Sequence, residues 1–301
     1  MNFRRTTWAA IAAAALLAVS ACGNAGEDDG DKGSDDTASS DYEVVSSPSF
    51  DAGTRMAEIA DAGTVKIGVK FDQPGIGFKA AGADSPSGFD PEMGKIIAGQ
   101  LGIAPDKIEW IETISDNREP FLQKGTVDFV LASYSITDER RKVVGQAGPY
   151  YVTGQSLLVA ADDDSIKGPD DLAGKKVCSV TGSTSIALVE DKYGATPAGF
   201  DTYSECVDQL KNGSVDAVTT DGAILLGYAS EAPDEIKVVG EPFSEERYGI
   251  GYNKDHPELC DFLNTTLEDA FKGDAYKTAF DKTLGEAGVD VPEPPALDPC
   301  A

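Results

Sequence analysis

The chain has 301 residues and a formal net charge of −27, from 52 acidic and 25 basic side chains. So large an excess of acidic groups argues against nucleic acid and against an anionic lipid surface as partners of the folded part. It also means that an anionic ligand would need a local cluster of basic side chains to hold it.

The first 22 residues have the pattern of an export signal. Arg4 and Arg5 precede an uncharged stretch, 6–21, which is shorter than the roughly 18 residues needed to span a bilayer as a helix. The small residues at 19–21 resemble a bacterial lipobox, so we expect residues 1–21 to be removed and Cys22 to carry palmitate-type acyl chains. An ordinary secretory signal that happens to contain a cysteine is the alternative.

Residues 22–48 are expected to form a disordered acidic tether. The segment consists largely of Gly, Ser, Asp and Glu, so it buries too little apolar surface to offset the entropy of ordering the chain. The expected location is therefore the outer, extracytoplasmic face of the cytoplasmic membrane, with the folded part held there by the lipid.

After the tether, strand and helix patterns alternate along the chain. The expected strands are 65–69, 108–111, 127–131, 176–180, 215–219 and 236–239. The expected helices are 91–101, 118–123, 183–193, 203–211, 224–228, 258–271 and 276–284. Asp90 is the expected N-cap of the first of these helices, with Pro91 in its first position.

Two extended segments, 149–159 and 248–252, separate the two alternating units. We therefore predict an α/β fold with two lobes, residues 49–153 with 249–301 and residues 154–248, joined by these hinge segments. Each lobe is expected to be a mixed, mainly parallel sheet flanked by helices. Ligands of such sheets bind beyond the carboxyl ends of the strands, so the cleft between the lobes is the expected site.

Four cysteines remain once Cys22 is assigned to lipid. An even number in an exported chain predicts two disulfides, for which three pairings are possible. We favour Cys178–Cys206 and Cys260–Cys300, because each pair would then lie within one lobe.

Five short motifs resemble the family-3 extracellular solute-binding proteins, the amino-acid-binding components of ABC importers. They are GVK at 68–70, GFD at 88–90, DFVLASYSITDER at 128–140, VTGST at 180–184 and DAVTTD at 216–221. The likeness extends over about 63–285. It is strongest to an actinobacterial glutamate-binding branch, which also shares NREP at 117–120 and SEERYG at 244–249.

The resemblance implies which residues hold the α-carboxylate of an amino acid. Arg140 stands where the family places an arginine for this group, and the planar guanidinium suits a carboxylate. Ser133 and Ser135 would add backbone and hydroxyl contacts, although turn chemistry alone would explain serines there. Ser183 and Thr184 open a helix, whose free N–H groups can hold an anion, and a plain N-cap is the alternative.

Four further residues are implied for the rest of the ligand. Asp221 resembles the family's partner for the α-amino group, with a helix N-cap as the alternative. Lys70 and Arg118 match positions that contact the distal carboxylate in relatives that bind aspartate or glutamate, although both could be ordinary surface cations. Tyr228 is expected near the cleft. Because an uncompensated buried carboxylate is strongly unfavourable, two cations predict glutamate, ahead of aspartate, and a neutral pocket would favour glutamine.

The sequence thus predicts a monomeric clamp that captures glutamate and delivers it to the membrane permease of an ABC importer, without cofactor or metal. No GxSxG, HExxH or P-loop motif suggests catalysis, and the single histidine, His256, is distant from every cysteine except Cys260. The alternatives are a glutamine or aspartate binder, a ligand-sensing ectodomain, and a dehydratase on the same fold.

Overall fold

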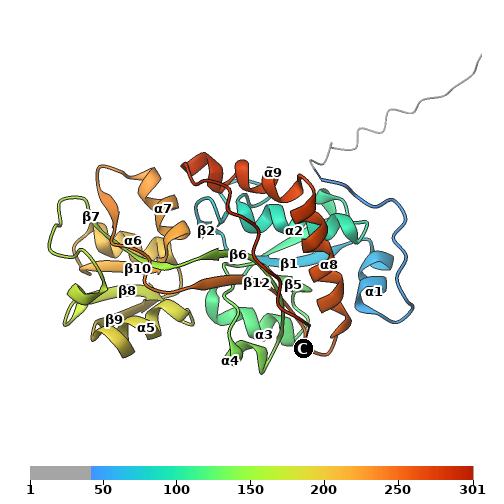
Figure 1. Cartoon of the computed structure of the whole chain (residues 1–301), viewed down its shortest axis with the longest axis horizontal. Coiled ribbons are helices and arrows are strands. Elements are labelled where there is room, and N and C mark those ends of the chain that lie inside the picture. Colours follow the sequence, from blue (N-terminus) through green and yellow to red (C-terminus); the bar gives the residue numbers. More distant parts are fainter. Residues whose placement is uncertain (1–41, 301) are drawn as a thin grey trace, which may run out of the picture. The chain divides into compact units, whose positions relative to one another are not determined.

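A computed structural model of the protein describes residues 42–300, and Cys22, the export signal and most of the tether lie outside the described residues. Two five-stranded sheets organise the chain (Figure 1). The first has the order β4-β1-β5-β12-β6 and the second the order β11-β7-β10-β8-β9. We refer to each sheet with its flanking helices as the first and the second lobe.

The strands of the first sheet are β1 (Val65–Val69), β4 (Ile108–Glu112), β5 (Phe129–Val130), β6 (Gly145–Thr153) and β12 (Glu246–Tyr252). Those of the second are β7 (Gln155–Ala160), β8 (Lys176–Val180), β9 (Thr196–Phe200), β10 (Ala217–Asp221) and β11 (Ile236–Val239). A small hairpin consists of β2 (Asp72–Gln73) and β3 (Gly77–Phe78). Strand β9 had no counterpart among the expected strands.

The helices are α1 (Arg55–Ala62), α2 (Phe89–Gln100), α3 (Arg118–Gln123), α4 (Asp138–Arg141), α5 (Thr184–Tyr193), α6 (Tyr203–Lys211), α7 (Gly222–Glu231), α8 (Glu258–Lys272) and α9 (Ala275–Asp281). Short 3₁₀ helices cover Pro105–Lys107, Ser115–Asn117, Pro169–Leu172 and Leu284–Ala287.

Both sheets are mixed, as expected, but the parallel share is smaller than the sequence predicted. In the first sheet β1 pairs in parallel with β4 and β5, whereas β12 is antiparallel to β5 and β6. The second repeats this balance, with β8 parallel to β9 and β10 and with β7 antiparallel to β10 and β11. The physical reason is that β6, β7 and β12 carry the chain between the lobes, and the returning chain runs in the opposite direction.

The chain changes sheets at Gly154, between β6 and β7, where the sequence placed the first lobe boundary. The second expected boundary, between residues 248 and 249, falls inside β12. The strands with which β12 pairs in the described residues are β5 and β6, so its whole length belongs to the first sheet.

Asp90 is not the N-cap of α2. Gly88 takes that position, and Asp90 lies inside the first turn of the helix, fully buried. Its carboxylate accepts hydrogen bonds from the Ser133 amide at 2.7 Å and the Tyr150 hydroxyl at 2.6 Å. Burial raises the pKa of Asp90 to about 6, although both hydrogen bonds oppose the shift. Asp90 therefore ties α2 to the loop after β5 and to β6.

An aromatic cluster packs α2 and α9 onto β6. The ring of Phe89 lies 5.5 to 6.0 Å from those of Tyr150, Tyr151, Tyr276 and Phe280, in edge-on or tilted arrangements. Such pairs contribute about 0.5–1.5 kcal/mol each beyond the area they bury. The crossing strand β6 is therefore firmly attached to the first lobe.

The end of the tether is ordered, which corrects the expected limit at residue 48. Tyr42 is 8% exposed and donates from its hydroxyl to Glu92 at 2.7 Å. The Val45 amide donates to the Gly99 carbonyl of α2 at 2.9 Å. A Cβ on Gly99 would lie 2.2 Å from the Glu43 carbonyl oxygen, so the absent side chain allows this close approach. Residues 42–48 therefore belong to the folded part.

Both disulfides are present with the favoured pairing. Cys178 of β8 bonds to Cys206 of α6, and Cys260 of α8 bonds to Cys300 near the C-terminus. Each bridge lies within one lobe. Each also removes conformational freedom from the unfolded chain, which in the chain-entropy account stabilises the fold by about 2–4 kcal/mol.

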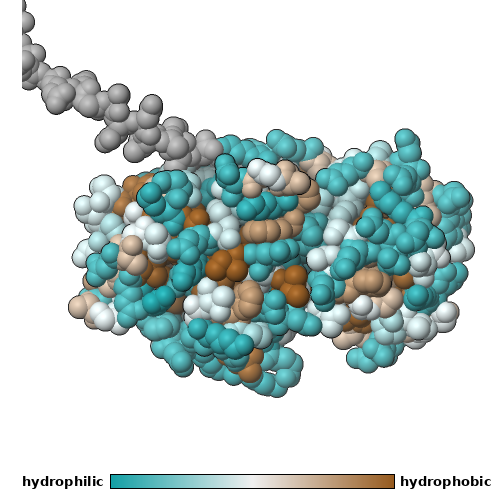
Figure 2. Space-filling view, turned by 180° about the vertical axis from the view of Figure 1, so that it is seen from behind, coloured by the Kyte–Doolittle hydropathy of each residue, from teal (hydrophilic) through white to brown (hydrophobic). Residues whose placement is uncertain are grey.

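The surface seen in Figure 2 is mainly hydrophilic, with separate apolar spots. Among residues 42–300, the large apolar side chains that are exposed are those of Val143, Val152 and Leu226. Over the same range, no helix has both the length and the apolar character that a membrane crossing requires.

Candidate functional site

A polar cavity lies between the two lobes, where strands of both sheets end. From the first lobe it is lined by Ser115, Arg118, Ser133, Ser135 and Arg140, and from the second by Ser183, Thr184, Ser185, Tyr203, Thr220, Asp221 and Ile224. The cavity volume is about 10 Å³, about what one water needs. In this conformation the lobes are closed over the site, so an amino acid can enter only if they separate.

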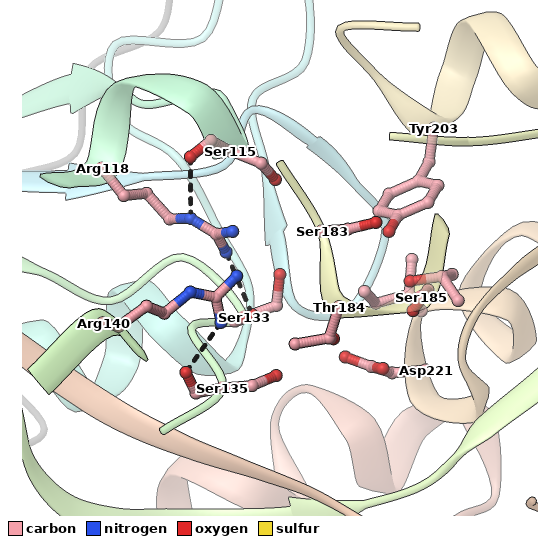
Figure 3. A pocket seen from close by; sticks show the side chains of 12 residues that line it. Ser115, Arg118, Ser133, Ser135, Arg140, Ser183, Thr184, Ser185, Tyr203 and Asp221 are labelled. Carbon is pink, nitrogen blue, oxygen red and sulfur yellow. Dashed lines mark hydrogen bonds between the residues drawn. The ribbon is translucent and has the colours of Figure 1, made fainter. Parts of the chain in front are cut away.

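Two guanidinium groups form the wall of the first lobe (Figure 3). Nη2 of Arg118 and Nη2 of Arg140 both donate to the Gly182 carbonyl oxygen of the second lobe, at 3.2 and 3.1 Å. A single oxygen that accepts from two cations marks a position where an anionic oxygen would be strongly favoured.

Gly182 has φ +76°, and a Cβ there would lie 2.1 Å from a carboxylate oxygen of Asp116 in the other lobe. Any other residue would therefore combine an unfavourable left-handed backbone with a steric clash between the lobes. Glycine at this point allows the carbonyl to reach both arginines.

Arg140 is held in place by neighbours of the first lobe. Its Nη1 donates to the Ser135 carbonyl at 2.7 Å, and its Nε lies 3.3 Å from Glu119 Oε1. The Tyr134 hydroxyl donates to the same Glu119 oxygen at 2.7 Å. The ring of Tyr134 lies between the two arginines, 4.9 Å from Cζ of Arg140 and 4.7 Å from Cζ of Arg118. These contacts leave Nη2 of Arg140 directed at the cavity.

Arg118 is 2% exposed and more deeply embedded than a surface cation would be. It donates to the carbonyls of Ser115, Ala132 and Ser133 at 3.1 to 3.4 Å. Burial first, and then the nearby Arg140, lower the pKa of Arg118 to about 10, so it stays charged at neutral pH. The alternative, that Arg118 is an ordinary surface cation, is therefore wrong.

At the start of α5, the hydroxyls of Ser183 and Thr184 make different hydrogen bonds. Ser183 is the N-cap, and its hydroxyl accepts from the Ile186 amide at 3.2 Å. The Thr184 hydroxyl donates to Glu246 Oε2 at 3.1 Å. A carboxylate only accepts, so the Thr184 proton is engaged and its oxygen can offer the cavity only lone pairs. Against an anion, this hydroxyl is therefore less useful than the backbone N–H groups around it.

Asp221 forms the opposite, acidic wall. Its side chain makes no capping hydrogen bond to α7, although it occupies the N-cap position. Oδ2 accepts from the Tyr248 hydroxyl at 2.6 Å, whereas Oδ1 is buried and has no hydrogen-bond partner among the described residues. Burial first, and then Glu246, raise the pKa of Asp221 to about 7. A buried acceptor without a donor is costly, and a ligand ammonium group would satisfy it.

Two expected site residues do not line the cavity. Lys70 is 3% exposed and donates to Ser115 Oγ at 2.9 Å, so it lies behind a residue that does line it. Burial first, and then Arg118, lower the pKa of Lys70 to about 7. The Tyr228 hydroxyl donates to the Asp72 carbonyl of the other lobe. Tyr228 therefore holds the lobes together beside the cleft.

The sequence did not indicate five lining residues, Ser115, Ser185, Tyr203, Thr220 and Ile224. Tyr203 could have been found, because it is the first residue of α6, directly after the N-cap Thr202 and within the capping box that Thr202 forms with Glu205. Its amide also donates to Asp72 Oδ2 at 2.7 Å across the cleft. The other four carry no comparable signal, because Ser115, Ser185 and Thr220 are common small hydroxyl residues and Ile224 is an ordinary apolar residue of α7.

Among the described residues, no cluster of three or more His, Cys, Asp or Glu side chains could hold a metal ion. The charged groups that line the cavity have opposite signs on its two walls. Cations of the first lobe face a carboxylate of the second.

The sequence profile of the bacterial extracellular solute-binding proteins, family 3, matches residues 65–286. The chain belongs to this family.

Individual relatives of this solute-binding protein support the same family assignment. A glutamate-binding protein, GluB, of Corynebacterium efficiens is 40% identical over 78% of this chain and 84% of its own length. The glutamine-binding protein GlnH of Bacillus subtilis is 35% identical, over 77% and 85%. A solved structure described as an ancestral arginine-binding protein bound to glutamine has 39% identity and a TM-score of 0.69, and the match covers 74% of this chain and 98% of that one. The resemblance inferred from the motifs is thereby confirmed.

Proposed function

We propose that this solute-binding protein captures L-glutamate in the cleft and presents it to the permease of an ABC-type importer. The observation that carries the proposal is the polarity of the cavity. Two arginine Nη2 atoms of the first lobe converge on one acceptor position at the cavity, and the second lobe contributes a buried carboxylate oxygen that has no partner among the described residues. An amino acid has the matching carboxylate and ammonium groups.

The excess of positive charge favours an acidic side chain on the ligand. Arg118 and Arg140 line the cavity, and Lys70 contacts Ser115 from the side that faces away from the cavity. One cation compensates the α-carboxylate, and the remaining positive charge favours a second carboxylate over a neutral amide. The relatives are named as glutamate-binding and as glutamine-binding proteins, so their names do not decide between the two ligands. The argument for glutamate therefore depends on these cations.

The proposed mechanism is a clamp that closes over its ligand. Contacts between the lobes, from Arg118 and Arg140 to Gly182 and from Tyr203 and Tyr228 to Asp72, exist only while the lobes are together. A ligand that touches both walls adds contacts that are also specific to the closed form, and it therefore shifts the population toward that form. The permease would recognise the closed surface of a monomer.

The proposal also includes the segment outside the described residues. Residues 1–21 would be removed, and acylation of Cys22 would hold the chain at the outer face of the cytoplasmic membrane. Stable anchoring takes more than one acyl chain, because each buried CH₂ contributes about 0.8 kcal/mol. Mass spectrometry of the membrane fraction, compared with a Cys22→Ala variant, would reveal the acylated peptide or contradict the anchor.

A thermal-shift screen of the twenty amino acids on the soluble fragment that begins at residue 23 tests the proposed ligand. Glutamate is expected to give the largest stabilisation, because a ligand at 100 times its Kd stabilises the folded state by about 2.7 kcal/mol. Calorimetry then measures the Kd values. A larger shift with glutamine, aspartate or any other amino acid would replace glutamate as the ligand, and no shift at all would refute amino-acid binding.

The ratio of the glutamate and glutamine affinities is expected to depend on pH through Lys70. Its pKa of about 7 lies below the ordinary 10.5, so its charge is present below pH 7 and is lost as the pH rises through 7. The preference for glutamate should therefore fall by about tenfold between pH 6 and pH 9. Because both ligands share the ammonium group, titration of Asp221 cancels in the ratio.

Lys70→Met should reduce the preference at pH 6 and remove its pH dependence. Lys66→Met, in the same strand but exposed, is the control and should behave as the wild type does. If the ratio is independent of pH in the wild-type protein, Lys70 has no part in the selectivity.

A further inference from the structure

The C-terminal segment, 290–300, lies across the first lobe and ends at the disulfide to α8. In Figure 1 its dark red trace passes over β6 and β12, the two strands that continue toward the second lobe. The Asp298 amide donates to the Gly148 carbonyl of β6 at 2.7 Å, and the Cys260–Cys300 bond fixes the chain two residues later. We call residues 290–300 the strap.

Every polar group of Asp298 has a partner. Asn264 of α8 donates from Nδ2 to the Asp298 carbonyl at 2.9 Å, and its Oδ1 accepts from the Gly148 amide at 2.9 Å. The Asp298 carboxylate accepts from Nη2 of Arg141 at 2.6 Å and from Nη2 of Arg247. The backbone of Asp298 is thus held independently of its side chain, and the carboxylate is presented to the two arginines in a fixed position.

These ion pairs differ from most surface pairs. The side chains of Asp298, Arg141 and Arg247 are 20, 30 and 32% exposed. An isolated exposed pair contributes little because it must order two long side chains. Here one short side chain on a fixed backbone serves two arginines, and most of the ordering is already achieved by the disulfide and the backbone hydrogen bonds.

Both arginines are adjacent in sequence to residues of the cavity or its immediate support. Arg141 follows Arg140 in α4, a helix of four residues that is too short to be stable by itself. Arg247 precedes Tyr248, whose hydroxyl donates to Asp221, and its carbonyl accepts from the Ile136 amide at 2.7 Å. Ser135 and Tyr248 form an isolated bridge between these two segments. Asp298 therefore fixes the backbone that carries Arg140 and the backbone that carries Tyr248.

We propose that Asp298 is a positioning residue for the two charged walls of the ligand site, and that the Cys260–Cys300 disulfide keeps it in place. The proposal rests on the proposed function, because it concerns the affinity of the same site. It predicts that the strap sets ligand affinity from outside the cleft. An exported chain that loses this disulfide would keep its fold and lose part of its affinity.

The test compares Asp298→Asn with Glu293→Gln, an exposed residue of the same strap. Asn keeps the size and the backbone hydrogen bonds of residue 298 but removes the charge. Asp298→Asn should weaken binding of L-glutamate, or of whichever amino acid the wild type binds most tightly, by about fivefold to tenfold. Glu293→Gln should leave it unchanged. The Cys260→Ser, Cys300→Ser double variant should show a similar loss, and adding Asp298→Asn to it should change little more.

A double-mutant cycle with Arg140→Lys separates positioning from general stability. If Asp298 acts through Arg140, the combined loss will be smaller than the product of the two single losses. Hydrogen exchange of the ligand-free protein gives a second measure, with faster exchange expected at 138–142 and 247–249 in Asp298→Asn. Unchanged affinity together with unchanged exchange would overturn the proposal. Should no amino acid bind the wild type, the proposed function fails, and the exchange data still decide whether Asp298 positions these segments.

Discussion

Arg140→Ala is expected to lower the affinity for the amino-acid ligand by about 100-fold or more. Arg140 supplies one of the two Nη2 groups that converge at the cavity, and the contacts to Ser135 and Glu119 direct it there. Hydrogen bonds to charged groups are worth about 1.5–3 kcal/mol each. Without the guanidinium, a carboxylate enclosed by the lobes would keep only part of its compensation. Calorimetry with L-glutamate measures the loss.

The matched control for this variant is Lys142→Ala. Lys142 directly follows α4 and forms an ion pair with Glu139 in which its side chain is 64% exposed. Removing it changes the net charge by the same amount but not the cavity. Affinity should stay near that of the wild type. Wild-type binding by Arg140→Ala would refute the assignment of the carboxylate-binding wall.

Asp221→Asn is expected to have two opposite effects. It should lower ligand affinity by about 100-fold, because an amide cannot provide the negative charge that an ammonium group needs. It should also raise the stability of the ligand-free protein by about 1–2 kcal/mol. The carboxylate is 4% exposed with one oxygen unpartnered, and it lies close enough to Glu246 for repulsion. Asparagine removes that repulsion and keeps an acceptor for Tyr248.

The gain in stability should depend on pH with a defined sign. The pKa of Asp221 is raised from 3.8 to about 7 in the folded protein. Between pH 4 and 7 the unfolded chain loses this proton while the folded chain keeps it, so the wild type loses stability as the pH rises. The advantage of Asp221→Asn should therefore be small near pH 4, grow up to pH 7 and stay constant above it.

Denaturant unfolding at several pH values measures this difference. Asp208→Asn, on the exposed side of α6 in the same lobe, is the control and should show no such trend. A pH-independent difference for Asp221→Asn would mean that the carboxylate is not destabilised by burial. Lower stability combined with unchanged affinity would remove Asp221 from the site altogether.

The results expected for Arg140→Ala and Asp221→Asn imply that the charged residues of the site destabilise the ligand-free protein. Arg118, Lys70 and Asp221 are all buried and have pKa values shifted toward their neutral forms, burial being the largest cause in each case. A ligand with both charges compensates this cost when the lobes close. The stability that the ligand-free protein loses through these buried groups is regained on binding, and this gain contributes to the affinity for the ligand.

The sequence alone determined the two α/β units, the two crossings, the number of disulfides and the family, because these follow from periodicity, cysteine number and ordered motifs. It favoured one disulfide pairing, which the structure then showed. It also indicated seven of the residues that line the cavity, among them Arg140, Thr184 and Asp221. Parallel strands bring their carboxyl ends to one edge, so residues just after such strands gather without any knowledge of packing.

Only the tertiary structure decided which groups reach the cavity and what orients them. Lys70 lies behind Ser115, the Thr184 proton is engaged by Glu246, and Asp298 holds Arg141 and Arg247 from the far end of the chain. These relations join residues separated by 45 to 157 positions, and no local pattern encodes them. They arise when β6, β12 and the strap come together, because polar groups that are removed from water must then find partners in whichever segments lie beside them.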